Sequence, residues 1–409
     1  SEPTGRPARA SRTAVFPGGT FTRRSRWAPF VAVIVVLALV AGAIVWLRHE
    51  AANYFVYSPG STPQIVTDAT CRAAASSDQL LLPGGSPCAR ITVPTDRSHD
   101  LQGRLYMVDV LVGPASWPQY ALDKLGLLKR FDQGTQLVPA QAVLGGTPPS
   151  QLACQTNQQM VGATEAASVA ALRRLGYSVK ENNLGALVAT VHPGTAADHS
   201  GVHCNDLITS FDGKAIHTAE DLGAAIGLTK PGQQVTLTVK RVAKGGKTET
   251  VTLHPKLTGT PALEGAAAEP NHPFLGVATQ TRVTFSLPFH VQFDVGSIGG
   301  PSAGLALTLA LLDVLSNGKL TGGHKVAATG TIDTDGNVGD VGGVAQKTVA
   351  VRREGVQLFF VPRGELAVAR SEAGSNLKVE AVSTLNQALA DLSAFGGDLS
   401  ALPPASRSS

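Results

Sequence analysis

Ser302 and Lys347 are the two residues whose types and settings best suit covalent chemistry. Ser302 stands in the turn Gly300-Pro301-Ser302-Ala303-Gly304, before an apolar run, and Lys347 follows the pair Gly342-Gly343. A serine in a tight glycine turn at the start of a helix can act as a nucleophile, because unpaired backbone N–H groups point toward it. A lysine can act as its base when burial in apolar surroundings lowers the pKa of the amine. The pair indicates a serine–lysine peptidase.

Both residues also have ordinary alternatives. Serine is a favoured helix cap, and lysine is usually an exposed surface residue. Gly300-x-Ser302-x-Gly304 also matches the nucleophile elbow of the α/β-hydrolases, which need an acid and then a histidine after the serine. The only later histidine is His324, with none from residue 325 onward. The order of residues along the chain therefore disfavours a hydrolase of that kind.

Residues 274–365 resemble the proteolytic domain of the Lon family. Three segments match its motifs in order and spacing: Gly300 to Gly304 the nucleophile turn, Thr329-Gly330-Thr331-Ile332 a strand motif, and Gly342-Gly343-x-x-x-Lys347 the base motif. The resemblance implies that Ser302 is the nucleophile and Lys347 the general base. It also implies supporting roles for Thr329, which would orient the lysine, and for Gly300 and Ala303. No G-x-x-x-x-G-K-[ST] loop occurs, so we expect proteolysis without ATP.

Residues 177–254 resemble a PDZ domain of the bacterial, protease-associated kind. The resemblance lies in a strand at 184–191, the turn His192-Pro193-Gly194-Thr195-Ala196-Ala197, a hairpin at 205–214, a helix at 218–226 that Thr218 could cap, and a strand at 234–241. It implies that an extended peptide adds beside an exposed strand edge. We expect that edge at Leu184, Gly185, Ala186 and Leu187. A PDZ-shaped spacer that binds no peptide is the alternative.

A membrane segment precedes these domains. Trp27 to Leu47 contains no charge, and its 21 residues match the thickness of a bilayer core. Six arginines lie before it and only Arg48 follows closely, which predicts a cytoplasmic N-terminus and an extracytoplasmic remainder. A cleaved signal peptide, with Ala41-Gly42-Ala43 as its small-residue site, is the alternative. The formal net charge of the chain is +4, and the first 26 residues alone carry +5, so the remainder carries −1. A nucleic-acid-binding protein would carry its positive charge on a folded domain, so this function is disfavoured.

The four cysteines suit an oxidising compartment. Cys71, Cys88, Cys154 and Cys204 all follow the apolar segment, and they allow three pairings. Our hypothesis is Cys71–Cys88 and Cys154–Cys204, because the first pair brackets a loop rich in Gly, Pro and Ser. A zinc site at His199, His203 and Cys204 is disfavoured because no C-x-x-C occurs, and we expect neither a metal nor a cofactor.

The expected fold is multidomain α+β, with one transmembrane helix, a mixed β-rich region, a PDZ-like domain and a C-terminal Lon-type α/β proteolytic domain. The expected segments are a disordered cytoplasmic tail at 1–26, a transmembrane helix at 27–47, a β-rich region with a helix at 48–176, the PDZ-like domain at 177–254, a linker at 255–272, the proteolytic domain at 273–395 and a disordered tail at 396–409. The sequence says little about what residues 51–160 do.

The expected function is that of a membrane-anchored serine endopeptidase acting on unfolded or flexible extracytoplasmic proteins, with substrate capture by the PDZ segment. The alternative is a non-catalytic adaptor or chaperone at the cell envelope. The expected partners are protein or peptide substrates and the cell membrane. The Lon resemblance also allows a homo-oligomeric ring, about which the residues themselves say nothing.

Overall fold

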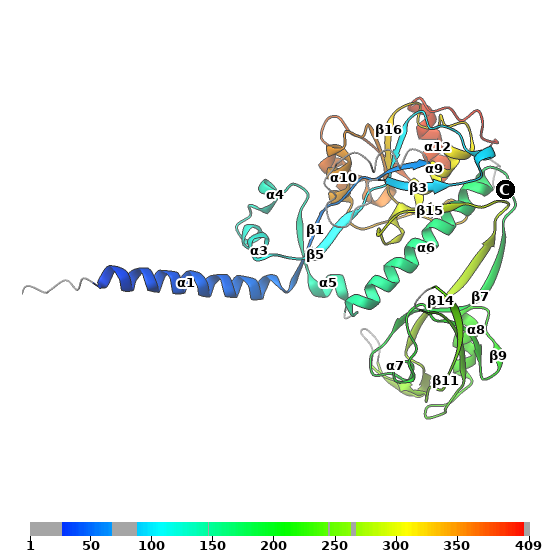
Figure 1. The fold of residues 1–409 in the computed structure, drawn as a ribbon, viewed down its shortest axis with the longest axis horizontal. Helices are drawn as coiled ribbons and strands as arrows, with labels where there is room; N and C mark the ends of the chain where they lie inside the picture. The colour runs from blue at the N-terminus through cyan, green and yellow to red at the C-terminus, as the bar shows by residue number, and fades with distance from the viewer. Residues whose placement is uncertain (1–26, 68–87, 146, 244–245, 263–266, 405–409) are drawn as a thin grey trace, which may run out of the picture.

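The structure is a computed structural model that describes residues 27–67, 88–145, 147–243, 246–262 and 267–404. The chain forms a protruding N-terminal helix followed by a mixed α/β body and a smaller β-rich body (Figure 1). The multidomain α+β fold is therefore confirmed. The tail expected at 1–26 lies outside the described residues.

The N-terminal helix α1 (Ala28–Ala51) is one turn longer than the segment expected from the sequence. Between Phe30 and Ala51 it is apolar, long enough to cross a bilayer and not buried against the rest of the chain. Within the described residues it is the one helix whose length and composition alone would allow it to cross a bilayer.

The larger body is built on a seven-stranded sheet. Its strand order is β15-β3-β2-β4-β16-β19-β20. Strands β4, β16, β19 and β20 run parallel to one another, whereas β2 is antiparallel to β4. The strands are β2 (Gln64–Thr67), β3 (Cys88–Thr92), β4 (Arg104–Tyr106), β15 (Gln292–Asp294), β16 (Lys325–Ala328), β19 (Leu358–Pro362) and β20 (Lys378–Val382). Three of these seven strands come from before residue 107. The β-rich region expected as a separate unit therefore contributes strands to the sheet of the larger body.

Helices cover both faces of this sheet. One hydrophobic core lies under α6 (Pro149–Arg174), α9 (Gly304–Leu315) and α12 (Leu385–Ala394), and a second lies under α10 (Val344–Arg353) and α11 (Leu366–Ala373). Helix α9 is buried over nearly its whole length, because Leu, Ala and Val occupy every side of it. Single 3₁₀ turns η1 (Thr95–Arg97), η2 (Pro301–Ala303) and η3 (Arg363–Glu365) and the hairpin β17 (Thr331–Ile332) and β18 (Val338–Gly339) complete this body.

The smaller body contains the strand order β11-β10-β8-β7-β14, with β9 beside β8. Its elements are β7 (Lys180–Val191), α7 (Ala196–Ser200), β8 (Leu207–Phe211), β9 (Lys214–Ala215), α8 (Ala219–Gly227), β10 (Leu237–Val242), β11 (Thr248–Leu253) and β14 (Val277–Ser286). Thr218 caps α8 by accepting from the backbone N–H of Asp221, as expected from the sequence. Strands β7 and β14 form the antiparallel ribbon that joins the two bodies (Figure 1).

A third group of short elements lies between α1 and the larger body. It contains a three-stranded sheet of β1 (Tyr54–Pro59), β5 (Val110–Pro114) and β6 (Gln136–Pro139), and the helices α3 (Trp117–Lys124), α4 (Leu128–Phe131) and α5 (Ala140–Leu144). The sequence predicts one strand from Arg104 to Val112. The structure divides it into β4 and β5, which belong to different sheets.

Two segments that we expected to be irregular contain paired or packed residues in the parts that the structure describes. The linker expected at 255–272 contains β12 (Thr258–Thr260), which pairs with β13 (Glu269–Phe274). The tail expected at 396–409 lies against the larger body through residue 403. The Asp398 N–H donates to the Lys319 carbonyl, the Arg174 guanidinium donates to the Pro403 carbonyl, and Leu402 is buried in the core. The tail packs against the larger body because burying its apolar side chains, such as Leu402, is favourable.

Candidate functional site

Ser302 lies in the turn that joins β15 to α9. The turn η2 holds Ser302, and helix α9 begins two residues later at Gly304. Gly300 has φ of 87°, a left-handed conformation that favours glycine. Its N–H donates to the Thr156 carbonyl on α6 at 2.8 Å, so α6 holds the turn from outside. The Gly300 N–H is thus already engaged, and Ala303 is buried beneath the turn.

The Ser302 carbonyl ties this turn to the end of β16. It accepts from the Gly330 N–H at 2.9 Å and from Thr329 Oγ1 at 3.2 Å. The Leu305 N–H donates in turn to the Gly330 carbonyl at 3.1 Å. A Cβ on Gly304 would lie 3.0 Å from the Ile332 nitrogen, which explains why the helix begins with glycine here. The nucleophile turn is therefore fixed against the Thr329-Gly330 segment on several sides.

Lys347 lies in the first turn of α10 and is buried, with 3% of its surface exposed. Its Nζ donates to Thr329 Oγ1 at 3.1 Å, and Thr329 has no exposed surface. Burial away from water lowers the pKa of Lys347 from 10.5 to about 8, against the opposing charges of Asp109 and Glu365. The amine is therefore neutral in an appreciable fraction of molecules near neutral pH.

Thr329 connects the two predicted catalytic residues. Its hydroxyl accepts from Lys347 Nζ and donates to the Ser302 carbonyl, so one side chain contacts both segments. Among the described residues, no hydrogen bond joins Lys347 Nζ to Ser302 Oγ directly. Catalytic hydrogen bonds are often long before substrate binds and shorten in the complex.

Two carboxylates near Lys347 escaped the sequence analysis. Asp109 follows β4, Thr329 follows β16 and Glu365 follows β19, and these strands are neighbours in the parallel part of the sheet. Residues after the carboxyl ends of parallel strands meet at one edge, where open α/β sheets place their sites. The Asp109 carboxylate accepts from both the backbone and the hydroxyl of Ser61. The sequence signal was weak, because the run from Arg104 to Val112 predicts one continuous strand that contains residue 109.

The predicted peptide-binding edge of the PDZ segment is wrong. Leu184, Gly185, Ala186 and Leu187 lie on β7, and β7 is paired with β8 on one side and with β14 on the other. Ala186 and Leu187 pair with both of these strands and Gly185 pairs with β14, so this stretch is not an open edge to which a peptide could add. Gly185 serves close packing instead, since a Cβ there would lie 2.5 Å from the Ile208 carbonyl oxygen.

Strand β14 forms the free edge on this side of the sheet. Helix α8 lies beside it, with the Ala219 N–H donating to Thr281 Oγ1 at 3.0 Å. The preceding turn contains Gly276 with φ of 92°, and a Cβ there would overlap the Thr195 side chain. An extended peptide that added to β14 would lie along α8.

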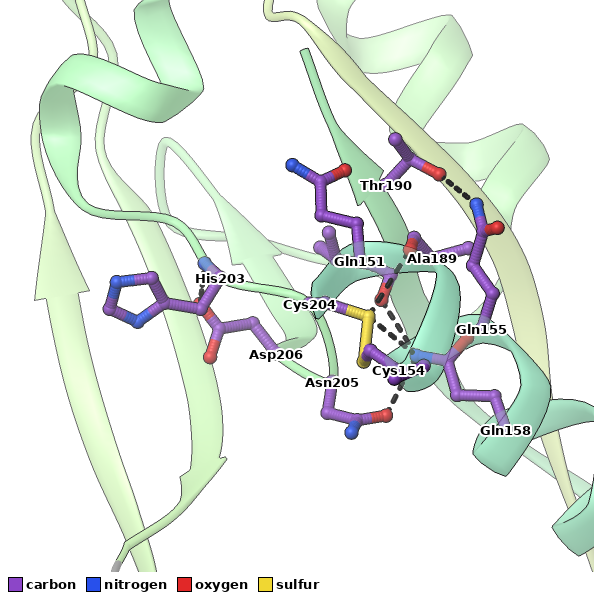
Figure 2. Close-up of a disulfide and its surroundings, with 12 residues drawn as sticks. Gln151, Cys154, Gln155, Gln158, Ala189, Thr190, His203, Cys204, Asn205 and Asp206 are labelled. Atoms are coloured by element: carbon purple, nitrogen blue, oxygen red, sulfur yellow. Dashed lines mark hydrogen bonds between the residues drawn. A yellow bond between two sulfur atoms is a disulfide. The ribbon is translucent and has the colours of Figure 1, made fainter. Parts of the chain in front are cut away.

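Helix α6 links the PDZ sheet to the nucleophile turn. A disulfide joins Cys154 on α6 to Cys204, which is the pairing expected from the sequence, and it leaves no thiolate at Cys204 to bind zinc (Figure 2). Gln151, Gln155 and Gln158 of α6 bond to β7 around it. Cys88 is also disulfide-bonded, and its expected partner Cys71 lies outside the described residues.

Comparisons with protein families agree with both resemblances. Residues 174–254 match the PDZ domain, and residues 277–393 match the Lon protease (S16) C-terminal proteolytic domain. The chain is 38% identical to the Lon protease of Malacoplasma penetrans over 103 residues, which is 24% of this chain and 13% of that protein. It is 26% identical to the Lon protease of Desulfatibacillum aliphaticivorans over 274 residues, 62% of this chain and 32% of that protein.

Among solved structures, the PDZ domain of an SdrC-like protein from Listeria innocua is 26% identical, with a TM-score of 0.18, covering 23% of this chain and 92% of that one. The matches to the two Lon proteases cover 13% and 32% of those proteins, so this chain spans about a third or less of their length.

Proposed function

Since this chain carries a PDZ domain and a Lon-type proteolytic domain, we propose that it is a membrane-anchored serine endopeptidase with Ser302 as nucleophile and Lys347 as general base. The observation that carries the proposal is the buried Lys347 amine, joined through Thr329 to the Ser302 turn. Burying an amine costs stability, and a scaffold protein would gain nothing in return.

The proposed reaction begins with neutral Lys347. One N–H of the amine stays on Thr329, which leaves the nitrogen lone pair to accept the Ser302 hydroxyl proton. Ser302 Oγ forms a bond to the substrate carbonyl carbon, and the carbonyl electron pair moves to oxygen. As the tetrahedral intermediate collapses, the peptide C–N bond breaks and the leaving nitrogen takes the proton from Lys347. Water then attacks the acyl–Ser302 ester while Lys347 takes its proton. The bond between the acyl carbon and Ser302 Oγ breaks, Lys347 returns the proton to Ser302 Oγ, and the acid product leaves.

The tetrahedral oxyanion needs hydrogen-bond donors. The N–H groups of Gly300, Gly304 and Leu305 already donate to Thr156, Pro301 and Gly330. We assign the role of oxyanion donor to the backbone N–H of Ser302 itself, at the positive end of α9. One such donor is worth about 3 kcal/mol of transition-state stabilisation in proteases.

Substrate capture is proposed at β14. An extended substrate segment would add to the free edge of β14 and lie along α8, with Thr281 at the contact. From Ser286 the chain leads through β15 to the Ser302 turn, so bound substrate would lie on the strand that connects to the nucleophile. Thr281→Trp, which places a bulky side chain where β14 meets α8, should weaken binding of an unfolded protein without slowing cleavage of a short peptide. Thr250→Trp on the opposite edge strand β11 is the control, and equal effects of both would refute capture at β14.

We also propose a location for the protein and a source of its substrates. Helix α1 would anchor the protein with the catalytic body outside the cytoplasm, which suits the disulfide. Proteolysis would proceed without ATP, so substrates would be unfolded or flexible segments.

The direct test compares the purified full chain with Ser302→Ala on an unfolded reporter protein. We expect cleavage to be lost in Ser302→Ala and retained in Ser316→Ala, a serine at the other end of α9. Cleavage by purified Ser302→Ala would refute the proposal. Binding of the reporter with no turnover by the unmodified protein would favour an adaptor instead.

A further inference from the structure

Helices α3 and α4 form a small, exposed segment beside the end of α1. Figure 1 shows both helices at the level where α1 ends, displaced to one side of its axis. The contact is direct. Tyr120 of α3 stacks on Tyr54, just after α1, with ring centroids 5.3 Å apart, and Lys124 Nζ lies over both rings. The segment is therefore held in a fixed position relative to α1.

The surface of this segment combines bulky apolar and cationic side chains. Leu125 and Phe131 are each 70% exposed, and Lys124, Lys129 and Arg130 beside them are also exposed. Within residues 117–132, two carboxylates oppose these three cations. Asp132 lies 4.0 Å from Arg353 of α10, and three cations against two carboxylates leave the segment with a net formal charge of +1. We call Lys124, Leu125, Lys129, Arg130 and Phe131 the α3–α4 surface.

The position of this surface relative to α1 indicates what it contacts. A bilayer crossed by α1 has its surface roughly across the α1 axis, at the level where the apolar run gives way to Arg48 and His49. A segment displaced sideways from that end lies in the plane of the bilayer surface. Bulky apolar side chains flanked by Lys and Arg are typical of segments that bind there.

We infer that the α3–α4 surface binds the headgroup region of an anionic bilayer, with Leu125 and Phe131 inserted among the lipids and the three cations on phosphate groups. This inference rests on the proposed membrane anchor and adds a second contact to it. Single contacts between proteins and bilayers leave orientation free, whereas two contacts fix it.

The second contact has a consequence for the catalytic body. Gln133, two residues after α4, accepts from Arg352 through its side chain and from Arg353 through its carbonyl. Both arginines belong to α10, the helix that carries Lys347. A lipid-bound α3–α4 surface would therefore hold the catalytic helix at a fixed height and orientation above the bilayer.

The test uses the full chain in lipid nanodiscs containing phosphatidylglycerol and headgroup-spin-labelled lipid. Because the described cysteines are disulfide-bonded, one added cysteine can carry a fluorophore. The labelled variants are Leu125→Cys and Phe131→Cys. Leu39→Cys in α1 is the membrane control, measured with a lipid that carries the spin label on its acyl chain. Leu228→Cys in the PDZ body is the aqueous control.

We expect most fluorescence to be lost by lipid quenching at positions 125 and 131 and little at 228, with weaker quenching when phosphatidylglycerol is replaced by phosphatidylcholine. Quenching at 39 without quenching at 125 and 131 would overturn the inference and leave the anchor standing. No quenching at 39 would overturn both. Quenching at 125 and 131 that disappears when each disc holds one copy would show a contact between copies instead and would also overturn the inference.

Discussion

The pH dependence of cleavage should report the titration of Lys347. Lowering its pKa from 10.5 to about 8 disfavours the ammonium form by about 3 kcal/mol and makes the neutral amine about 300-fold more abundant at pH 7. The neutral amine is the active form of a general base, so activity should increase as the pH rises through the pKa of Lys347. The value of kcat/KM should rise about tenfold per pH unit below pH 8 and level off above it.

Charge removal near Lys347 tests the same reasoning. The carboxylate of Glu365 favours the ammonium form, so Glu365→Gln should lower the pKa of Lys347 further and move the profile to lower pH. Glu249→Gln, on the exposed strand β11, should leave the profile in place. The assay is kcat/KM for a fluorogenic peptide from pH 6 to pH 10 in the full chain. A flat profile, or a shift to higher pH in Glu365→Gln, would refute a buried lysine base.

Three further predictions concern the support of the site. Thr329→Val should lower kcat about tenfold or more with little change in KM, because the Lys347 amine loses its hydrogen-bond acceptor. Thr329→Ser keeps a hydroxyl at this position and should retain kcat. Equal rates in both variants would contradict the positioning role. Replacing Cys154 and Cys204 together by Ala opens a loop of 50 residues and should destabilise the PDZ body by up to about 4 kcal/mol, measured by thermal unfolding; an unchanged midpoint would contradict this. Gly304→Ala should destabilise the protein by about 1–3 kcal/mol, because the new Cβ meets the Ile332 backbone, whereas Gly162→Ala on α6, where nothing lies within 4 Å, should not; equal midpoints in thermal unfolding would refute the packing argument.

Local sequence signals predicted the elements nearest the chemistry. The apolar run after the glycine turn forms α9 and Thr218 caps α8, because each depends on residues close together in the chain. The family resemblances, which the comparisons confirm, rest on motifs of the same short range.

Long-range pairing was beyond the sequence analysis. Strand β4 pairs in parallel with β16, more than two hundred residues later, and no local pattern specifies such a partner. The role of residues 51–160 and the position of Asp109 were missed for this reason. The edge of the PDZ sheet was misplaced for the same reason, since the strand that covers β7 is β14, from beyond the expected linker.

Covalent labelling of Ser302 tests the central claim most directly. The full chain in its membrane would be treated with a serine-reactive phosphonate, and the modified residue identified by peptide mass spectrometry. The account predicts an adduct on Ser302 that is lost in Lys347→Met, a variant that keeps the buried volume but removes the amine. An adduct on Ser302 formed equally fast without the Lys347 amine, or none in the unmodified protein, would contradict it.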